Sequence, residues 1–174
     1  METPPEARPH ASPDERVEEV DREGNVTRLV TRAAMRAGRL RHRAVFVVVT
    51  NSAGDLLVHR RAVTKDVWPG WWDIAVGGVA APGESWEAAA RRELREETGV
   101  EAATLEALGT GLYEDETVRV VGAVFRCESE GPFTCPDGEI DEAHWAKREE
   151  LAHWWAGKRF LPDSLALVLP RIGP

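Results

Sequence analysis

Residues 78–100 read GVAAPGESWEAAARRELREETGV, and the rest of the chain is organised around this stretch. Successive residues of an α-helix turn by about 100°, so Glu93, Glu96 and Glu97 share one helical face. Like charges at these spacings repel one another, by roughly a few tenths of a kcal/mol per pair. A helix shaped only for stability would avoid the triplet, whereas a site for a hard cation such as Mg2+ needs carboxylate oxygens. The pattern therefore favours a metal-binding helix.

The spacing around the triplet carries more information than the acids alone. Gly78 is followed after five residues by Glu84 and after a further seven by Arg92, and Gly99 ends the predicted helix. The segment resembles a complete Nudix box, because it matches that family's signature at every fixed position and at both aliphatic ones. Such a match would arise by chance in roughly one chain in ten million of this length. The resemblance implies an α/β fold, namely an α/β/α sandwich with a mixed sheet.

The resemblance also implies roles for the box residues. The implied ligands of Mg2+, for which Mn2+ is a possible substitute, are Glu93, Glu96, Glu97 and the backbone carbonyl of Gly78. Arg92 and Glu84 would orient these ligands from outside, as metal sites generally require, and Arg92 counts among the implied catalytic residues. The plain alternative is a solvated acidic helix face. The exact spacing of the fixed residues favours the metal site over that alternative.

Hydrolysis of a diphosphate also needs a base that takes a proton from water. Glu93 is one candidate. Glu139 and Glu142, in the segment GEIDE at residues 138–142, are others, because many Nudix proteins supply a late acid just before a strand tryptophan such as Trp145. A plain surface loop is an equally good interpretation of that segment.

A second group of residues is a candidate for binding substrate. Arg60, Arg61 and Lys65 form a basic group at the end of a predicted strand, which is either a solvated sheet edge or a clamp for phosphates. Residues 68–72 read WPGWW. Their rings either pack over the sheet edge or include one, assigned to Trp71, that lines a pocket and stacks on a base.

Composition limits the classes of function. The chain has 174 residues and a formal net charge of -8, which argues against general binding to nucleic acid or anionic membrane. No run of eighteen apolar residues and no signal-peptide pattern is present, so we expect a cytoplasmic protein. Residues 1–15 are rich in proline and charge and predict a disordered tail, leaving a single domain over residues 16–174. Cys127 and Cys135 are expected to be reduced thiols.

Hydrophobic periodicity and turn residues predict the remaining elements. Strands are expected at residues 17–20, 26–29, 44–50, 56–61, 73–76, 105–113, 117–127 and 143–146. Helices are expected at residues 31–38, between Ser85 and Gly99, and at residues 148–156 and 162–169. The apolar run at 44–50 indicates a strand buried on both faces, with 56–61 as its hairpin partner. Residues 105–113 and 117–127 predict a second hairpin.

The expected activity is Mg2+-dependent hydrolysis of a pyrophosphate bond in a small-molecule nucleoside diphosphate derivative. One alternative is an isomerase, because residues 56–79 look similar to a bacterial Nudix subgroup near the isopentenyl-diphosphate isomerases. Those isomerases use a cysteine at the position of Gly77 and a glutamate at that of Val120, and neither residue here exchanges protons. A further alternative is a non-catalytic nucleotide-binding module, although no box acid is eroded. A homodimer formed through residues 17–29 is also possible.

Overall fold

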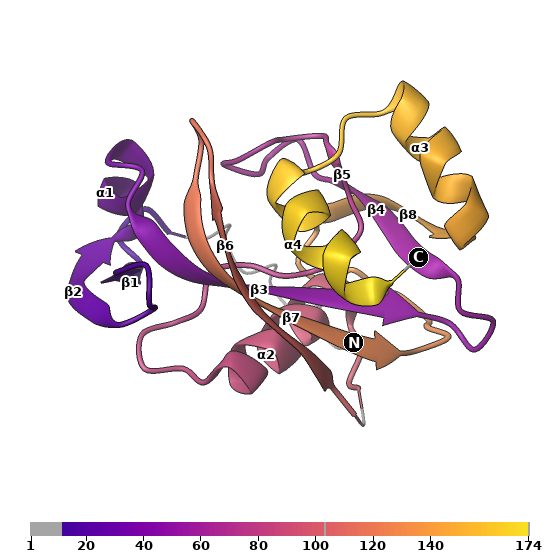
Figure 1. Cartoon of the computed structure of the whole chain (residues 1–174), viewed down its shortest axis with the longest axis horizontal. Helices are drawn as coiled ribbons and strands as arrows, with labels where there is room; N and C mark the ends of the chain where they lie inside the picture. Colours follow the sequence, from indigo (N-terminus) through magenta and orange to yellow (C-terminus); the bar gives the residue numbers. More distant parts are fainter. Residues whose placement is uncertain (1–11, 103, 174) are drawn as a thin grey trace, which may run out of the picture.

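The protein is built around one mixed β-sheet. The structure is a computed structural model, and it describes residues 12–102 and 104–173. Its strands are β1 (Arg16–Val20), β2 (Val26–Thr31), β3 (Arg41–Thr50), β4 (Leu56–Arg61), β5 (Trp72–Asp73), β6 (Glu106–Glu114), β7 (Arg119–Glu128) and β8 (Ile140–Ala146). The helices are α1 (Arg32–Ala37), α2 (Trp86–Thr98), α3 (Leu151–Gly157) and α4 (Pro162–Ile172), with a 3-10 turn at Arg148–Glu150. Figure 1 shows β3 and β7 at the centre of the sheet.

The central strand β3 is buried on both faces, as its apolar run predicts. Its odd-numbered valines pack with Ala89, Ala90 and Leu94 of α2, whereas Phe46 and Val48 pack with Leu167 and Val168 of α4. Helices α2 and α4 thus cover opposite faces of the sheet (Figure 1). The predicted α/β/α sandwich with a mixed sheet is confirmed.

The predicted hairpin between residues 44–50 and 56–61 is present, but its pairing is confined to the turn end of the two strands. Strand β3 pairs with β4 only at Thr50 and Leu56, while β4 pairs along its length with β8. On its other edge, β3 runs parallel to β7 over its whole length. Along most of β3, the edge expected to pair with residues 56–61 pairs instead with residues 76–80. Val45 N–H donates to Gly78 O at 2.9 Å, and Val47 N–H donates to Val76 O at 2.7 Å.

The predicted strand at residues 73–76 is shortened for the same reason. Only Trp72–Asp73 pairs with β4, and the chain then crosses to β3. The crossing brings backbone against backbone at Gly77, where a Cβ atom would lie 1.9 Å from Val45 O. Glycine is therefore required there for close approach rather than for an unusual φ.

The predicted tail over residues 1–15 lies mostly outside the described residues. Within the described part, Ala33 N–H donates to Pro13 O at 2.9 Å and Arg32 N–H donates to Glu15 O at 2.7 Å, so residues 13–15 are fastened to α1. No helix among the described residues is long and apolar enough to cross a membrane. Both cysteines are unpaired, in agreement with the prediction.

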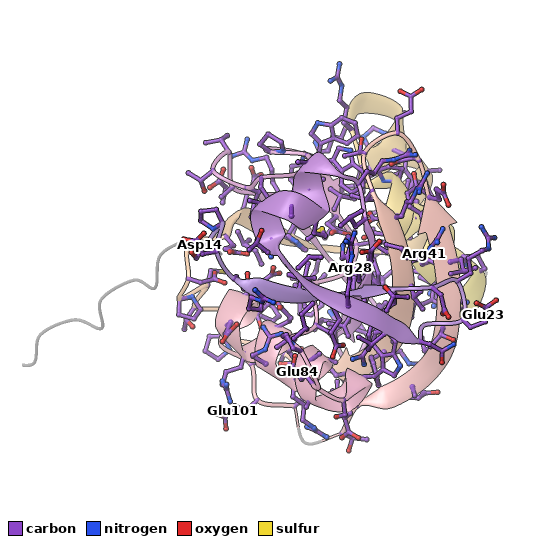
Figure 2. The ribbon with its side chains drawn as sticks, turned by 90° about the vertical axis from the view of Figure 1, so that its left-hand side faces the viewer. Asp14, Glu23, Arg28, Arg41, Glu84 and Glu101 are labelled. Carbon is purple, nitrogen blue, oxygen red and sulfur yellow. The ribbon has the colours of Figure 1, made fainter. Side chains whose placement is uncertain are left out.

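Strand β2 forms one edge of the sheet, and Figure 2 shows Arg28 on this side of the molecule. Val26 and Leu29 of this strand are 53% and 48% exposed. The homodimer through residues 17–29 stays a prediction.

Candidate functional site

Helix α2 carries the acidic triplet and is capped at both ends as its sequence predicts. The Ser85 hydroxyl accepts from Ala88 N–H at 3.1 Å, which satisfies one of the unpaired donors of the first turn. At the other end Gly99 has a φ of 77°, in the left-handed region, and its N–H donates to Arg95 O. These caps hold the helix in register with the loop before it.

Glu84 and Arg92 form the framework on which the acids are arranged. The guanidinium donates to both Glu84 oxygens, through Nε at 3.0 Å and Nη2 at 2.9 Å. Glu84 also accepts from Ala81 N–H at 2.9 Å, and Arg92 donates to Val79 O at 3.2 Å. Paired bonds of this kind fix direction as well as distance. Figure 2 shows Glu84 at the turn that leads into α2.

Two acids of the triplet are held by the same arginine. Arg92 Nη1 lies 2.6 Å from Glu93 Oε1 and 3.2 Å from Glu96 Oε2. Glu93 also lies against Gly78, where a Cβ atom would stand 2.8 Å from Glu93 Oε2. Burial raises the pKa of Glu93, while Arg92 opposes that rise. The absence of a side chain at Gly78 therefore makes room for this carboxylate.

The third acid, Glu97, points towards a lysine. Its side chain is only 3% exposed and lies 3.6 Å from Lys65 Nζ, and Lys65 also pairs closely with Glu139. Burial raises the pKa of Glu97 well above its ordinary value, and Lys65 opposes this effect. Burial acts in the same direction on Glu139, but Lys65 holds the pKa of that carboxyl below its ordinary value. Lys65 and Glu139 thus join the box acids in space.

The donor set suits a hard divalent cation. Glu93, Glu96 and Glu97 supply carboxylate oxygens along one helix, and Gly78 leaves space beside them. Within residues 12–102 and 104–173, no three acidic, histidine or cysteine side chains converge as a formed metal site. Arg92 and Lys65 instead pair with these acids. The Gly78 carbonyl already accepts one hydrogen bond, from Val45, and has a second lone pair left.

The other candidate base, Glu142, lies elsewhere. It is on β8, with its carboxylate 2.6 Å from His144 Nε2 and 3.5 Å from Arg60 Nη2. A hydrogen bond between the Glu142 carboxylate and His144 holds the pKa of Glu142 below its ordinary value. The sequence favours Glu142 and keeps Glu139 as an alternative, whereas in the structure Glu139 is the one that contacts Lys65 beside Glu97.

The three residues of the basic group also lie in different surroundings. Arg61 and Lys65 line a cavity of about 80 Å³ that also reaches Gly77 and Gly78. Arg60 is not among its lining residues and pairs with the acids of β8. The pairing of β4 with β8 is irregular between Arg60 and Arg61, and only Arg61 reaches the cavity.

The tryptophan cluster is mostly structural. Trp72 is 8% exposed and packs edge-on against Trp154, with ring centroids 5.2 Å apart. Trp71 lies beside Arg159, whose guanidinium carbon is 5.6 Å from the ring centroid, and does not line the cavity. Trp68 does line it.

The cavity contains residues that the sequence analysis missed. They are Arg32 and Arg36 of α1, Asp66, which pairs with both arginines, Asp73 at the end of β5, and Asp163 in the first turn of α4. No motif or spacing connects these positions, which come from four distant parts of the chain. The one sequence feature that marks Asp73 and Asp163 is that each lies next to an apolar run, at residues 72–76 and 161–168.

A hydrogen bond and an ion pair of Glu18 connect strand β1 to the turn before α2 and to Arg43 of β3. Glu18, only 8% exposed, accepts from Gly83 N–H at 2.8 Å and lies 3.3 Å from Arg43 Nη1. Arg43 in turn donates to Glu84 O at 2.9 Å and stacks 4.0 Å over the Trp86 ring. We call these four contacts the Glu18 clasp.

Comparison with known proteins gives one consistent result. A protein-family model described as "NUDIX domain" matches residues 40–164. The chain is 43% identical over 149 residues to a protein of Yersinia pestis, covering 86% of this chain and 81% of that one. It is 41% identical to YfcD of Escherichia coli strain K12, covering 88% and 84%. Both relatives are named as uncharacterized Nudix hydrolases.

Solved structures agree. DR0079 from Deinococcus radiodurans is similar with a TM-score of 0.72 and 29% identity, covering 86% of this chain and 94% of that one. The NUDIX domain of NrtR from Shewanella oneidensis, solved with ADP ribose, has a TM-score of 0.59 at 18% identity, covering 79% and 94%. At that identity the second likeness concerns the fold alone.

Proposed function

Because the chain belongs to the Nudix family, we propose that it hydrolyses a pyrophosphate bond in a nucleoside diphosphate linked to another group, with Mg2+ bound by Glu93, Glu96 and Glu97. The observation that supports this most is the contact of Lys65 with both Glu97 and Glu139, because Lys65 also lines the cavity, as Gly78 does. Relatives named as Nudix hydrolases support a hydrolase acting on pyrophosphate-type substrates.

Mg2+ would supply neutralisation of the phosphate oxygens and a more acidic water. The chain's own residues hold the acids in position. Arg92 ties Glu84, Glu93 and Glu96 together, so that their oxygens do not have to be ordered when substrate arrives. Arg61 and Lys65 present positive charge to the cavity and would bind the substrate's phosphates. The contacts of Arg60 and Trp71 give less support for a substrate role.

For the base we propose Glu139, with Glu142 and Glu93 as the alternatives. Glu139 contacts Lys65, which also contacts Glu97, so its carboxylate lies beside the proposed metal site. An ionised carboxylate next to the phosphate site is what proton removal from water needs. Glu142 points towards His144 and Arg60 instead. In the reaction one P–O bond of the diphosphate breaks, water supplies the new oxygen, and two phosphate products leave.

Replacing Glu139 with glutamine is expected to lower kcat by about a hundredfold with little change in KM, because a general base typically contributes roughly 10²–10⁴-fold. Steady-state rates across pH measure the change. The matched control is Glu128→Gln, an exposed acid of β7 away from the cavity. A loss in Glu142→Gln together with normal turnover in Glu139→Gln would move the role to Glu142.

The activity itself is tested with a panel of nucleoside diphosphate compounds, beginning with ADP-ribose, which a protein of the same fold binds. We expect phosphate-ester products with Mg2+ present, loss of turnover with a chelator, and recovery when Mg2+ or Mn2+ is added back. Chromatography with mass spectrometry identifies both halves of the cleaved compound. No cleavage of any member, with Mg2+ in excess, would contradict the proposal.

The isomerase alternative is not favoured. Its reaction moves a proton on carbon, and the two positions that would exchange protons, Gly77 and Val120, both line the cavity here without a titratable group. The non-catalytic alternative is also weaker, because Glu93, Glu96 and Glu97 are all present and joined to Arg92 or Lys65.

A further inference from the structure

The cavity continues past the proposed phosphate site into a small, mostly apolar chamber on the α4 side of the sheet. Its apolar walls are Ala44, Phe46, Ala75, Val118, Val120 and Leu161. The whole volume is about 80 Å³. One water-sized group needs roughly 10–15 Å³, so the whole cavity, including the end lined by Gly78 and Lys65, holds about six such groups. A single ring or a short chain fits this space better than a purine nucleoside.

Two carboxyl groups interrupt the apolar wall. Asp73 is 4% exposed, and its Oδ1 accepts from Ile74 N–H at 2.7 Å and Ala75 N–H at 3.1 Å. Asp163 is 7% exposed, and its Oδ1 accepts from Ser164 N–H at 2.8 Å. Both side chains line the cavity. Among the described residues, Asp163 Oδ2 has no hydrogen-bond partner, although it belongs to a side chain more than nine-tenths buried.

The charged groups around Asp163 do not explain its burial. Asp73 of β5 and Asp115 of the β6–β7 turn are acidic, and Arg61 of β4 is the cation that acts on it. Burial, followed by the charge of Asp73, raises the pKa of Asp163 to about 7, and burial raises that of Asp73 to about 6. A buried carboxyl with an oxygen left unpaired destabilises the fold, because that oxygen has lost its water without gaining a partner. Such a group in a folded protein calls for a partner, and a ligand bound in the cavity would supply one.

We propose that this chamber binds the second group of the diphosphate substrate, that this group is compact and donates hydrogen bonds from an amine or amino nitrogen, and that Asp163 selects it. The inference rests on the proposed function, because it requires the diphosphate to lie between Gly78 and Lys65. An amine offers several N–H donors and a positive charge to two facing acids. A hydrocarbon would leave Asp163 Oδ2 unpaired, and an alcohol offers one donor and no charge.

The test uses two probes that differ only where the chamber would bind them. They are the 2-aminoethyl and propyl esters of methylenediphosphonate, in which an ammonium replaces a methyl group and the P–C–P bridge resists hydrolysis. Calorimetry with Mg2+ measures the affinity of the whole chain for each. We expect the wild type to bind the aminoethyl ester about tenfold or more tightly than the propyl ester, since hydrogen bonds to charged groups are worth about 1.5–3 kcal/mol.

Asp163→Asn keeps the size of the side chain and should reduce that preference to about threefold or less, without changing the affinity for methylenediphosphonate itself. The matched control, Asp14→Asn, makes the same chemical change at an exposed position and should keep the full preference. Thermal unfolding checks that both variants fold, and Asp163→Glu serves as a second variant if asparagine is not tolerated, with an altered preference expected from its longer side chain.

Equal affinity of the wild type for the two esters, or an undiminished preference in the folded Asp163 variant, would overturn the inference while leaving the proposed function standing. If methylenediphosphonate does not bind in the presence of Mg2+, the diphosphate site itself is refuted and the inference falls with it. The three results are distinguishable in one set of titrations.

Discussion

Replacing Glu97 with glutamine is expected to lower kcat by about a thousandfold or more while the fold persists. Glu97 is the most buried of the three box acids, at 3% exposed, and its carboxylate lies 3.6 Å from the amine of Lys65, a residue that lines the cavity. Loss of a metal ligand removes several kcal/mol of transition-state stabilisation, and each 1.36 kcal/mol is tenfold in rate. Glutamine has nearly the same size, so packing around α2 is kept.

The measurement is kcat with Mg2+ on whichever compound the wild type cleaves, together with Mn2+ affinity by calorimetry. Glu101→Gln is the matched control, because Glu101 is an exposed acid just beyond the end of α2 (Figure 2). Unchanged turnover and unchanged Mn2+ uptake in Glu97→Gln would remove this residue from the metal site. A loss of rate without a loss of uptake would instead indicate a role towards the substrate.

Replacing Gly77 with alanine should destabilise the protein by about 3 kcal/mol or more. The new Cβ would lie 1.9 Å from Val45 O and 2.8 Å from Val45 C, so backbone would have to move in the central strand β3. Overpacking of a core usually costs about 1–3 kcal/mol, and a clash with backbone lies at the upper end of that range. Chemical denaturation followed by fluorescence measures the change.

The control for this substitution is Gly157→Ala. Gly157 ends α3, has no atom within 4 Å of an added Cβ, and has no positive φ. Alanine there should be neutral or slightly stabilising, because it reduces the entropy of the unfolded chain. Similar stability of the two variants would contradict the close approach of residues 76–80 to β3.

Local signals allowed the box helix to be predicted almost to the residue. Ser85 and Gly99 mark its ends because capping is decided within one turn of the chain. The same holds for β6 and β7, whose turn at residues 115–118 is bounded by apolar strands. The pairing of Arg92 with Glu84 was not predicted as such, because the resemblance implied only that both residues orient the acids.

Pairing between distant segments could not be predicted in this way. Strand β4 pairs with β3 only beside the turn that joins them, because the glycines at residues 77–78 let another segment approach β3 more closely. The cavity was missed for a related reason. Asp73 and Asp163 are 90 positions apart (163 − 73) and meet only because α4 packs across the sheet. Neither acid carries a local pattern that marks it.

The Glu18 clasp bears on where this protein can be cut. Residues 40–164 match the family description, and an engineer shortening the gene would naturally start there. Such a fragment would lack Glu18, the acceptor for Gly83 N–H, and the turn that presents Glu84 would lose an anchor. The amino-terminal hairpin therefore supports the turn that carries Glu84 and is not a dispensable extension.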